Sequence, residues 1–186
     1  RAQRQVLCFA KMQGTQDDYI FFDNRDGSIL CPESLCVSLL DRHQSIGGNG
    51  IVLIEESQVA DAKMRIYNRD GTEGQVAGNS IRCMAKYLYD KGIVKKEEMT
   101  IETGTGLCRI QVYTRNGFVT SASVHLGKAL LRPEQVPVTL PGDKVVDRPV
   151  TIGGQEYRVT CCNVGNPHCV VFCPNVEAVN LEAIGP

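Results

Sequence analysis

The spacing of apolar and polar residues predicts many short strands and three helices. The longest helix is expected over 78–91, where apolar residues recur at helical spacing, small polar groups cap the start and Gly92 ends it. A second helix is expected from Pro32 to Arg42. Residues 176–184 suit a short third helix, ended by Gly185.

Alternating or continuous apolar runs indicate the strands. They occupy residues 6–12, 19–23, 51–54, 63–68, 99–103, 107–113, 118–124, 148–152 and 155–164. The polar residues 14–18 form a turn between the first two strands, and Asn116-Gly117 predicts a hairpin. This order lacks a regular strand–helix–strand alternation, so it predicts an α+β fold.

Proline becomes frequent after Leu126, at positions 133, 137, 141 and 149. We therefore expect a junction near residues 120–130 and two domains, covering residues 1–122 and 123–186. The part after the junction has only about sixty residues, which form a marginal core by themselves. The second domain is thus predicted to be incomplete.

Composition narrows the class of protein. Hydrophobic residues make up 42% of the 186 residues and the net charge is −1, as in ordinary globular proteins. Positive and negative charges are nearly equal in number, which argues against nucleic acid or a membrane surface as the partner. No apolar run approaches the roughly 18 residues of a membrane helix, and no signal-peptide core follows the basic start. We expect a soluble cytoplasmic protein.

The nine cysteines stand mostly among apolar neighbours, as buried free thiols do. Their spacing fits no common zinc site, so no metal is expected. A disulfide framework is not expected in a reducing cytoplasm.

Three segments rich in glycine and amide side chains are candidates for a binding site: residues 11–19, 68–83 and 165–169. In the second, Gly78 and Asn79 lead directly into a helix, whose first amides lack intrahelical acceptors and attract an anion such as a carboxylate. A side chain at Ala77 would point into the same pocket. The alternative is an ordinary glycine-capped loop.

In the third segment, Asn166 precedes Pro167, which disfavours helix at Asn166 and fixes the local chain direction. His168 lies between this turn and an apolar run. The alternative is a histidine that only forms a hydrogen bond at the start of a strand.

Four motifs in this order resemble the diaminopimelate epimerase family. They are Lys11–Tyr19, Asp41-Arg42-His43 with the glycines up to Gly50, Asn68–Cys83, and Gly165-Asn166-Pro167-His168. The resemblance covers most of residues 8–186.

The resemblance implies two similar domains, each with a curved mixed or antiparallel sheet around a central helix. The active site of the family lies between them and needs neither pyridoxal phosphate nor metal. Two cysteines face opposite sides of the substrate α-carbon, and they interconvert LL- and meso-diaminopimelate in lysine and cell-wall synthesis. A small amino acid is thus the expected partner, and the resemblance allows a homodimer.

Particular residues take roles by the same resemblance. The amides of Gly78 and Asn79 would grip the substrate carboxylate, Asn68 and Asn166 match substrate-binding positions, and His168 matches a residue near the catalytic cysteines. Cys83 matches a family cysteine that we interpret as a packing residue.

Three departures from the family pattern change these expectations. Ala77 occupies the position of the first catalytic cysteine, and the second catalytic cysteine of the pattern lies beyond residue 186. Asp17 replaces an asparagine and would prefer an amine to a carboxylate. We therefore expect an inactive form, with Ala77 either an introduced substitution or a natural divergence. The alternatives are another amino-acid racemase of the superfamily and a binding protein without activity.

Overall fold

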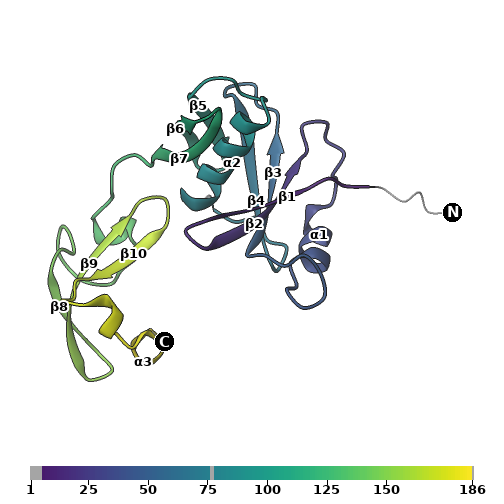
Figure 1. Ribbon diagram of the computed structural model, residues 1–186. Coiled ribbons are helices and arrows are strands. Elements are labelled where there is room, and N and C mark those ends of the chain that lie inside the picture. Colours follow the sequence, from purple (N-terminus) through teal and green to yellow (C-terminus); the bar gives the residue numbers. More distant parts are fainter. Residues whose placement is uncertain (1–5, 76–77, 186) are drawn as a thin grey trace. The chain divides into compact units, whose positions relative to one another are not determined.

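The computed structural model describes residues 6–75 and 78–185 (Figure 1). The chain divides into two compact units, Arg1–Leu126 and Gly127–Pro186. The expected boundary after residue 122 falls inside strand β7 (Phe118–His125), which pairs with its neighbour up to His125. The first unit therefore includes the whole of this strand.

The first unit contains one sheet of seven strands in sequence order. The strands are β1 (Ala10–Gly14), β2 (Asp17–Asp23), β3 (Gly50–Glu55), β4 (Ala62–Asn68), β5 (Glu98–Thr103), β6 (Gly106–Arg115) and β7. The pairs β2–β3 and β4–β5 are parallel and the other pairs are antiparallel. The sheet is therefore mixed.

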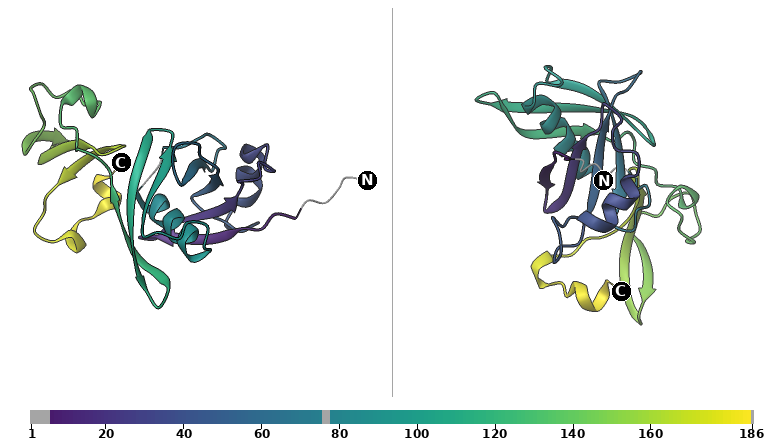
Figure 2. Two further views of the ribbon diagram at one scale, coloured as in Figure 1. Left: turned by 90° about the horizontal axis from the view of Figure 1, so that it is seen from above. Right: turned by 90° about the vertical axis from the view of Figure 1, so that its right-hand side faces the viewer.

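Helix α2 (Gly78–Asp90) lies inside the curve of this sheet. It contacts β1 and β2 near one edge and β6 and β7 at the other (Figure 1). Ile81, Met84 and Leu88 on this helix are fully buried against side chains from most strands. Because both edges meet one helix, the sheet curls around it (Figure 2). The predicted α+β fold is confirmed.

Helix α1 (Pro32–Leu39) covers the opposite face of the middle strands, where Cys36 and Leu40 pack with Ile51 and Leu53. Strands β2 and β3 are thus buried on both faces, and their apolar runs do not alternate. The predicted helix end at Arg42 is wrong. The Asp41 carboxylate accepts hydrogen bonds from the amides of residues 43 and 44, which favours a turn over further helix.

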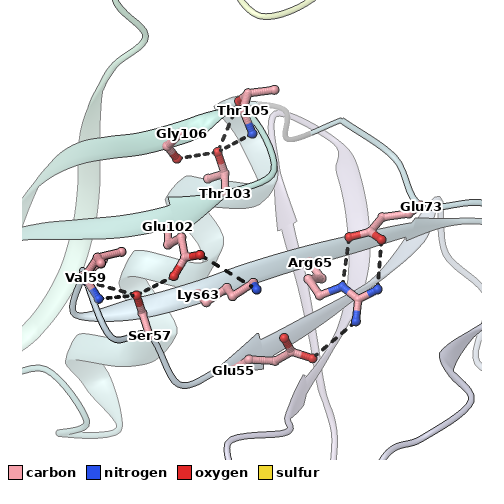
Figure 3. A network of polar contacts seen from close by, with 11 residues as sticks. Glu55, Ser57, Val59, Lys63, Arg65, Glu73, Glu102, Thr103, Thr105 and Gly106 are labelled. Carbon is pink, nitrogen blue, oxygen red and sulfur yellow. Dashed lines mark hydrogen bonds and ion pairs between the residues drawn. The ribbon is translucent and has the colours of Figure 1, made fainter.

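A row of charged side chains crosses the outer face of β3–β5. Arg65 donates two hydrogen bonds of 2.9 Å to the carboxylate of Glu73, and its guanidinium lies 3.8 Å from Glu55 (Figure 3). Lys63 lies 3.8 Å from Glu102, which also accepts a hydrogen bond from Ser57. Partly exposed pairs of this kind stabilise a protein by about 0.2–1 kcal/mol each. The bidentate pair of Arg65 and Glu73 also has a structural role, because it ties the segment after β4 to that strand.

The second unit is a three-stranded antiparallel sheet of β8 (Arg148–Ile152), β9 (Gln155–Asn163) and β10 (Pro167–Val171), with β9 in the middle. A short turn η1 (Pro133–Gln135) precedes it. The core of the second unit consists of Val136, Val145, Val159 and Cys161.

The predicted helix over 176–184 is wrong. The segment contains two short pieces, η2 (Val176–Ala178) and α3 (Leu181–Ile184). Val179 between them is extended, with φ −84° and ψ 122°, and the side chain of Asn180 accepts a hydrogen bond from Ala183 to start the second piece.

All nine cysteines are free. Cys36, Cys83 and Cys161 are buried as expected, but four others are exposed, so the expectation of generally buried thiols is wrong. The exposed ones lie outside the strands or on the edge strand β10, where apolar neighbours do not imply burial: Cys8, Cys31, Cys169 and Cys173. Over residues 6–75 and 78–185, no helix is long and apolar enough to cross a membrane.

Candidate functional site

The first candidate segment forms a tight hairpin. Thr15 and Gln16 have positive φ angles of 54° and 65°, as both central residues of a type I′ turn require. The expected five-residue turn is therefore shorter, and β1 and β2 extend to Gly14 and Asp17, which face each other. A side chain at Gly14 would stand 3.1 Å from the carbonyl oxygen of Asn79, so glycine allows the hairpin to approach α2.

Asp17 connects three segments of the first unit. One carboxylate oxygen accepts hydrogen bonds from Tyr19 Oη at 2.7 Å and from Asn79 Nδ2 at 3.3 Å, and the other accepts one from Asn49 Nδ2 at 2.8 Å. Burial, together with the hydrogen bond to Asp17, raises the pKa of Tyr19 above its ordinary value. The tyrosine therefore remains a proton donor, and the structure brings the predicted residues 17 and 79 together.

Asp18 points to a different set of partners. Arg42 donates two hydrogen bonds to its carboxylate, and the Lys11 ammonium lies 2.8 Å away. The Arg42 guanidinium holds the pKa of Asp18 far below its usual range. Arg42 also donates a 3.0 Å hydrogen bond to Asn49 Oδ1. The Asp41-Arg42-His43 motif thus supports the hairpin and the asparagine that holds Asp17.

The first turn of helix α2 lies beside the β1–β2 hairpin. Arg82, one turn into the helix, donates hydrogen bonds to the Gly78 carbonyl at 3.0 Å, to Asn79 Oδ1 at 2.7 Å and to Thr15 Oγ1 at 3.2 Å. In any α-helix the amides of the first turn have no intrahelical acceptor and lie at the positive end of the helix dipole, so the start of α2 suits an anion. Ala77, the expected position of a catalytic cysteine, lies outside the described residues.

Asn68 ends β4 at the same end of the sheet as the hairpin. Register pairs link it to Gly50 of β3, and Gly50 to Tyr19 of β2. Its side-chain amide donates a 3.1 Å hydrogen bond to Thr72 Oγ1, within a turn that folds back on β4. Asn68 is exposed, so a ligand at this end of the sheet can reach it.

The third candidate segment is the turn between β9 and β10 of the second unit. His168 Nε2 lies 2.9 Å from Asn166 Oδ1, and both side chains are exposed. The structure therefore brings these two predicted residues together. The strand β10 that follows carries His168 opposite Cys162.

A cavity of about 370 Å³ lies beside the hairpin, between the edge strands β1 and β7 and over α2. Gly14, Arg82, Lys86 and Cys83 line it. Burial raises the pKa of the Cys83 thiol, which suits the predicted packing role rather than proton transfer. Among the residues that the structure describes, no group of three or more histidine, cysteine or acidic side chains could hold a metal ion.

Sequence reasoning missed Thr15, Asn49 and Arg82. Asn49 lies in a glycine-rich loop and Arg82 on a helix face. The sequence around either residue does not indicate which side chain it contacts. The hydrogen-bonded register of β2 with β3 and the approach of β1 to α2 create these contacts.

Solved structures share the fold of the chain. A probable proline racemase from Agrobacterium radiobacter aligns over 97% of this chain and 54% of its own, with a TM-score of 0.64 and 16% identity. A predicted epimerase from Pseudomonas aeruginosa aligns over 97% of this chain and 67% of its own, with a TM-score of 0.60 and 13% identity.

Sequence comparison gives the family. A diaminopimelate epimerase of Caldanaerobacter subterraneus is 39% identical over 178 residues, which cover 96% of this chain and 64% of the relative. One from Methanococcus maripaludis is 40% identical over the same shares. The chain thus spans about 64% of the length of these relatives. The sequence profile of diaminopimelate epimerases matches residues 9–131, which include the hairpin and the start of α2, and the chain belongs to the diaminopimelate epimerase family.

Proposed function

We propose that the protein to which this chain corresponds interconverts LL- and meso-diaminopimelate by proton transfer between two cysteines, without a cofactor. The contact between Asp17 and Asn79 is the observation that supports this proposal most, because it joins the hairpin to the amides that would bind the substrate carboxylate. Gly78 supplies the first of these amides.

The chemistry requires stabilisation of a carbanion. An α-proton is only weakly acidic, whereas a free thiol has a pKa of about 8.5, so a thiolate alone is a weak base for this step. Helix amides on the carboxylate stabilise the negative charge that develops when the proton leaves. Asn68 and Asn166 would orient the substrate, and His168, held by Asn166, would tune a cysteine or hold its proton.

Ala77 has no acidic or basic group, so it cannot remove or deliver the α-proton at the position where the family pattern has a cysteine. We therefore propose that this form binds the amino acid without converting it. The intact binding motif around Ala77 favours an introduced substitution over natural divergence.

The test restores the missing group. Ala77→Cys in the longer protein, with the second cysteine present, should exchange the α-proton of diaminopimelate with deuterated solvent, as followed by NMR. The unchanged Ala77 form is the matched control and should bind the substrate in calorimetry without exchange. Binding without exchange in the Ala77→Cys protein would contradict the proposed reaction.

A second candidate is another amino-acid racemase, and Asp17 favours it. Its carboxylate replaces the asparagine of the family pattern and would attract a substrate amine where the family binds a carboxylate. A substrate panel separates the two. Faster exchange on a monocarboxylic amino acid such as histidine than on diaminopimelate would favour the racemase.

A third candidate is a binding protein that lost the base naturally. The source gene decides this case. An alanine codon at position 77 together with the absence of a later cysteine motif would support it, whereas a cysteine codon would exclude it.

A further inference from the structure

Two cysteines of the second unit stand directly opposite each other. Cys161 of β9 pairs with Cys169 of β10 in the antiparallel register. The amide of Cys161 donates to the carbonyl of Val145 at 3.0 Å, and the amide of Asn163 donates to that of Leu130 at 2.9 Å. Both amides therefore point away from β10, so the cysteines form a non-hydrogen-bonded pair.

Residues of such a pair approach closely. Their Cα atoms lie about 4.5 Å apart in an antiparallel sheet, within the range of about 4.4–6.8 Å that disulfides bridge. Directly opposite residues also point to the same face of the sheet. The register thus places the two thiols where a bond requires little movement of the backbone.

The two thiols differ in access. Cys161 is 3% exposed and packs with Val136 and Val159, whereas Cys169 is exposed. Burial raises the pKa of the Cys161 thiol, and the neighbouring Cys169 raises it further. A reagent in solution therefore meets Cys169, while Cys161 can react only with a sulfur that Cys169 brings to it.

We propose that Cys161 and Cys169 form a reversible disulfide across the β9–β10 hairpin, by exchange with a small-molecule disulfide. The Cys169 thiolate attacks the reagent, forms a mixed disulfide and releases one thiolate, which takes up the proton of Cys169. The Cys161 thiolate then attacks the Cys169 sulfur and displaces the second thiolate, which takes up the proton of Cys161. The protein loses two protons and two electrons, which equal two hydrogen atoms, and the reagent is reduced to two thiols.

The disulfide would close a loop that contains Asn166 and His168. Thiol–disulfide exchange at this hairpin is separate from the proposed epimerisation and does not depend on it. The disulfide would hold β10, the strand that carries His168, against β9.

The experiment uses the 186-residue chain with Cys162→Ser and Cys173→Ser, which leaves Cys161 and Cys169 in the second unit. The folded protein is treated with oxidised glutathione, the remaining thiols are blocked with N-ethylmaleimide and the protein is cut with trypsin. Because residues 159–186 contain no lysine or arginine, they form one peptide. This peptide should carry no maleimide and weigh about 2 Da less than the reduced peptide, for the two hydrogens lost.

Two variants are matched controls. Cys161→Ala with Cys173→Ser leaves Cys162 and Cys169, whose side chains point to opposite faces by the alternation of a strand. Cys169→Ser with Cys173→Ser leaves Cys161 and Cys162 and keeps the buried cysteine in the core. Circular dichroism confirms that each variant is folded, and neither should form an internal disulfide under these conditions.

Two results would overturn the proposal. One is a glutathione adduct that persists on Cys169 while Cys161 still reacts with maleimide. The other is a disulfide that forms as fast between Cys162 and Cys169. In 8 M urea, about the concentration that unfolds most domains, the selectivity should disappear because the strand register is lost.

Discussion

Asp17 and Asp18 are adjacent in sequence but differ in surroundings, because successive residues of a strand point to opposite faces. Asp17 is held by neutral donors, among them Tyr19 and Asn79, and lies beside the proposed substrate carboxylate site. Asp18 is held by the cations Lys11 and Arg42. The first carboxylate thus shapes the candidate site, and the second fixes the hairpin that carries it.

Asp18→Asn should destabilise the protein at neutral pH by about 1.5–3 kcal/mol, the usual value for hydrogen bonds to charged groups. Because the folded state lowers the pKa of Asp18, its contribution is present above the unfolded pKa of about 4 and is lost as the pH falls. Urea unfolding should therefore show a difference between wild type and variant that narrows below about pH 4. Asp143→Asn, at an exposed position, is the control and should show no such difference. A difference that stays constant with pH would contradict the ion pair.

Gly14→Ala tests the approach of the hairpin to α2. The new methyl group would stand 3.1 Å from the Asn79 carbonyl oxygen and 3.3 Å from Cys83 Sγ, so strand and helix must separate. Thermal unfolding should show a loss of about 1–3 kcal/mol, as for other overpacked contacts. At Gly104 the same substitution meets no atom within 4 Å and should cost less. Equal losses at both positions would show that Gly14 is not a site of close approach.

At the scale of elements, the hairpin between β1 and β2 carries backbone strain. Gln16 has a φ of 65°, which costs an L-residue about 1–2 kcal/mol. Gln16→Gly should thus stabilise the protein by about 0.5–1 kcal/mol after the entropy cost of glycine. Chemical denaturation measures the change. The contrasting variant is Gln155→Gly, at an exposed position of β9 without positive φ, which should destabilise. A loss of stability at both positions would contradict the strain.

The sequence predicts the elements of the first unit well because each shows either an apolar period or, as in β2 and β3, a continuous apolar run. Helix α2 begins at Gly78 as predicted and ends at Asp90, one residue before the predicted end and two residues before Gly92. Prediction fails where one side chain decides the backbone, as Asp41 does after α1 and Asn180 does before α3. These local hydrogen bonds end or start a helix without changing the pattern of apolar residues, so the pattern does not reveal them.

The candidate site is only partly predictable for a related reason. Motifs locate Asp17, Asn79, Asn166 and His168, since glycine and proline mark their turns. That Asp17 contacts Asn79 follows from strand register and helix packing, which a motif does not contain. The role of Ala77 remains a prediction.

At the scale of the molecule, the two units differ in the size of their cores. The first unit has two clusters of buried side chains, on the two faces of its sheet, whereas the second has one cluster of four residues. The assignment of residues 123–186 to the first part of a second, similar domain stays a prediction. A small core implies that local openings of the second unit cost less free energy.

Hydrogen exchange of the whole chain tests this difference. Amides of β3 in the first unit should exchange only by global unfolding, because the strand is buried on both faces. Amides of β9, also a central strand, should exchange at least about tenfold faster, which corresponds to about 1.4 kcal/mol or more of easier opening. Since both strands have neighbours on each side, edge effects do not explain a difference between them. Equal protection of β3 and β9 would mean that the second unit is stabilised to the same degree as the first, and that four buried side chains understate its core.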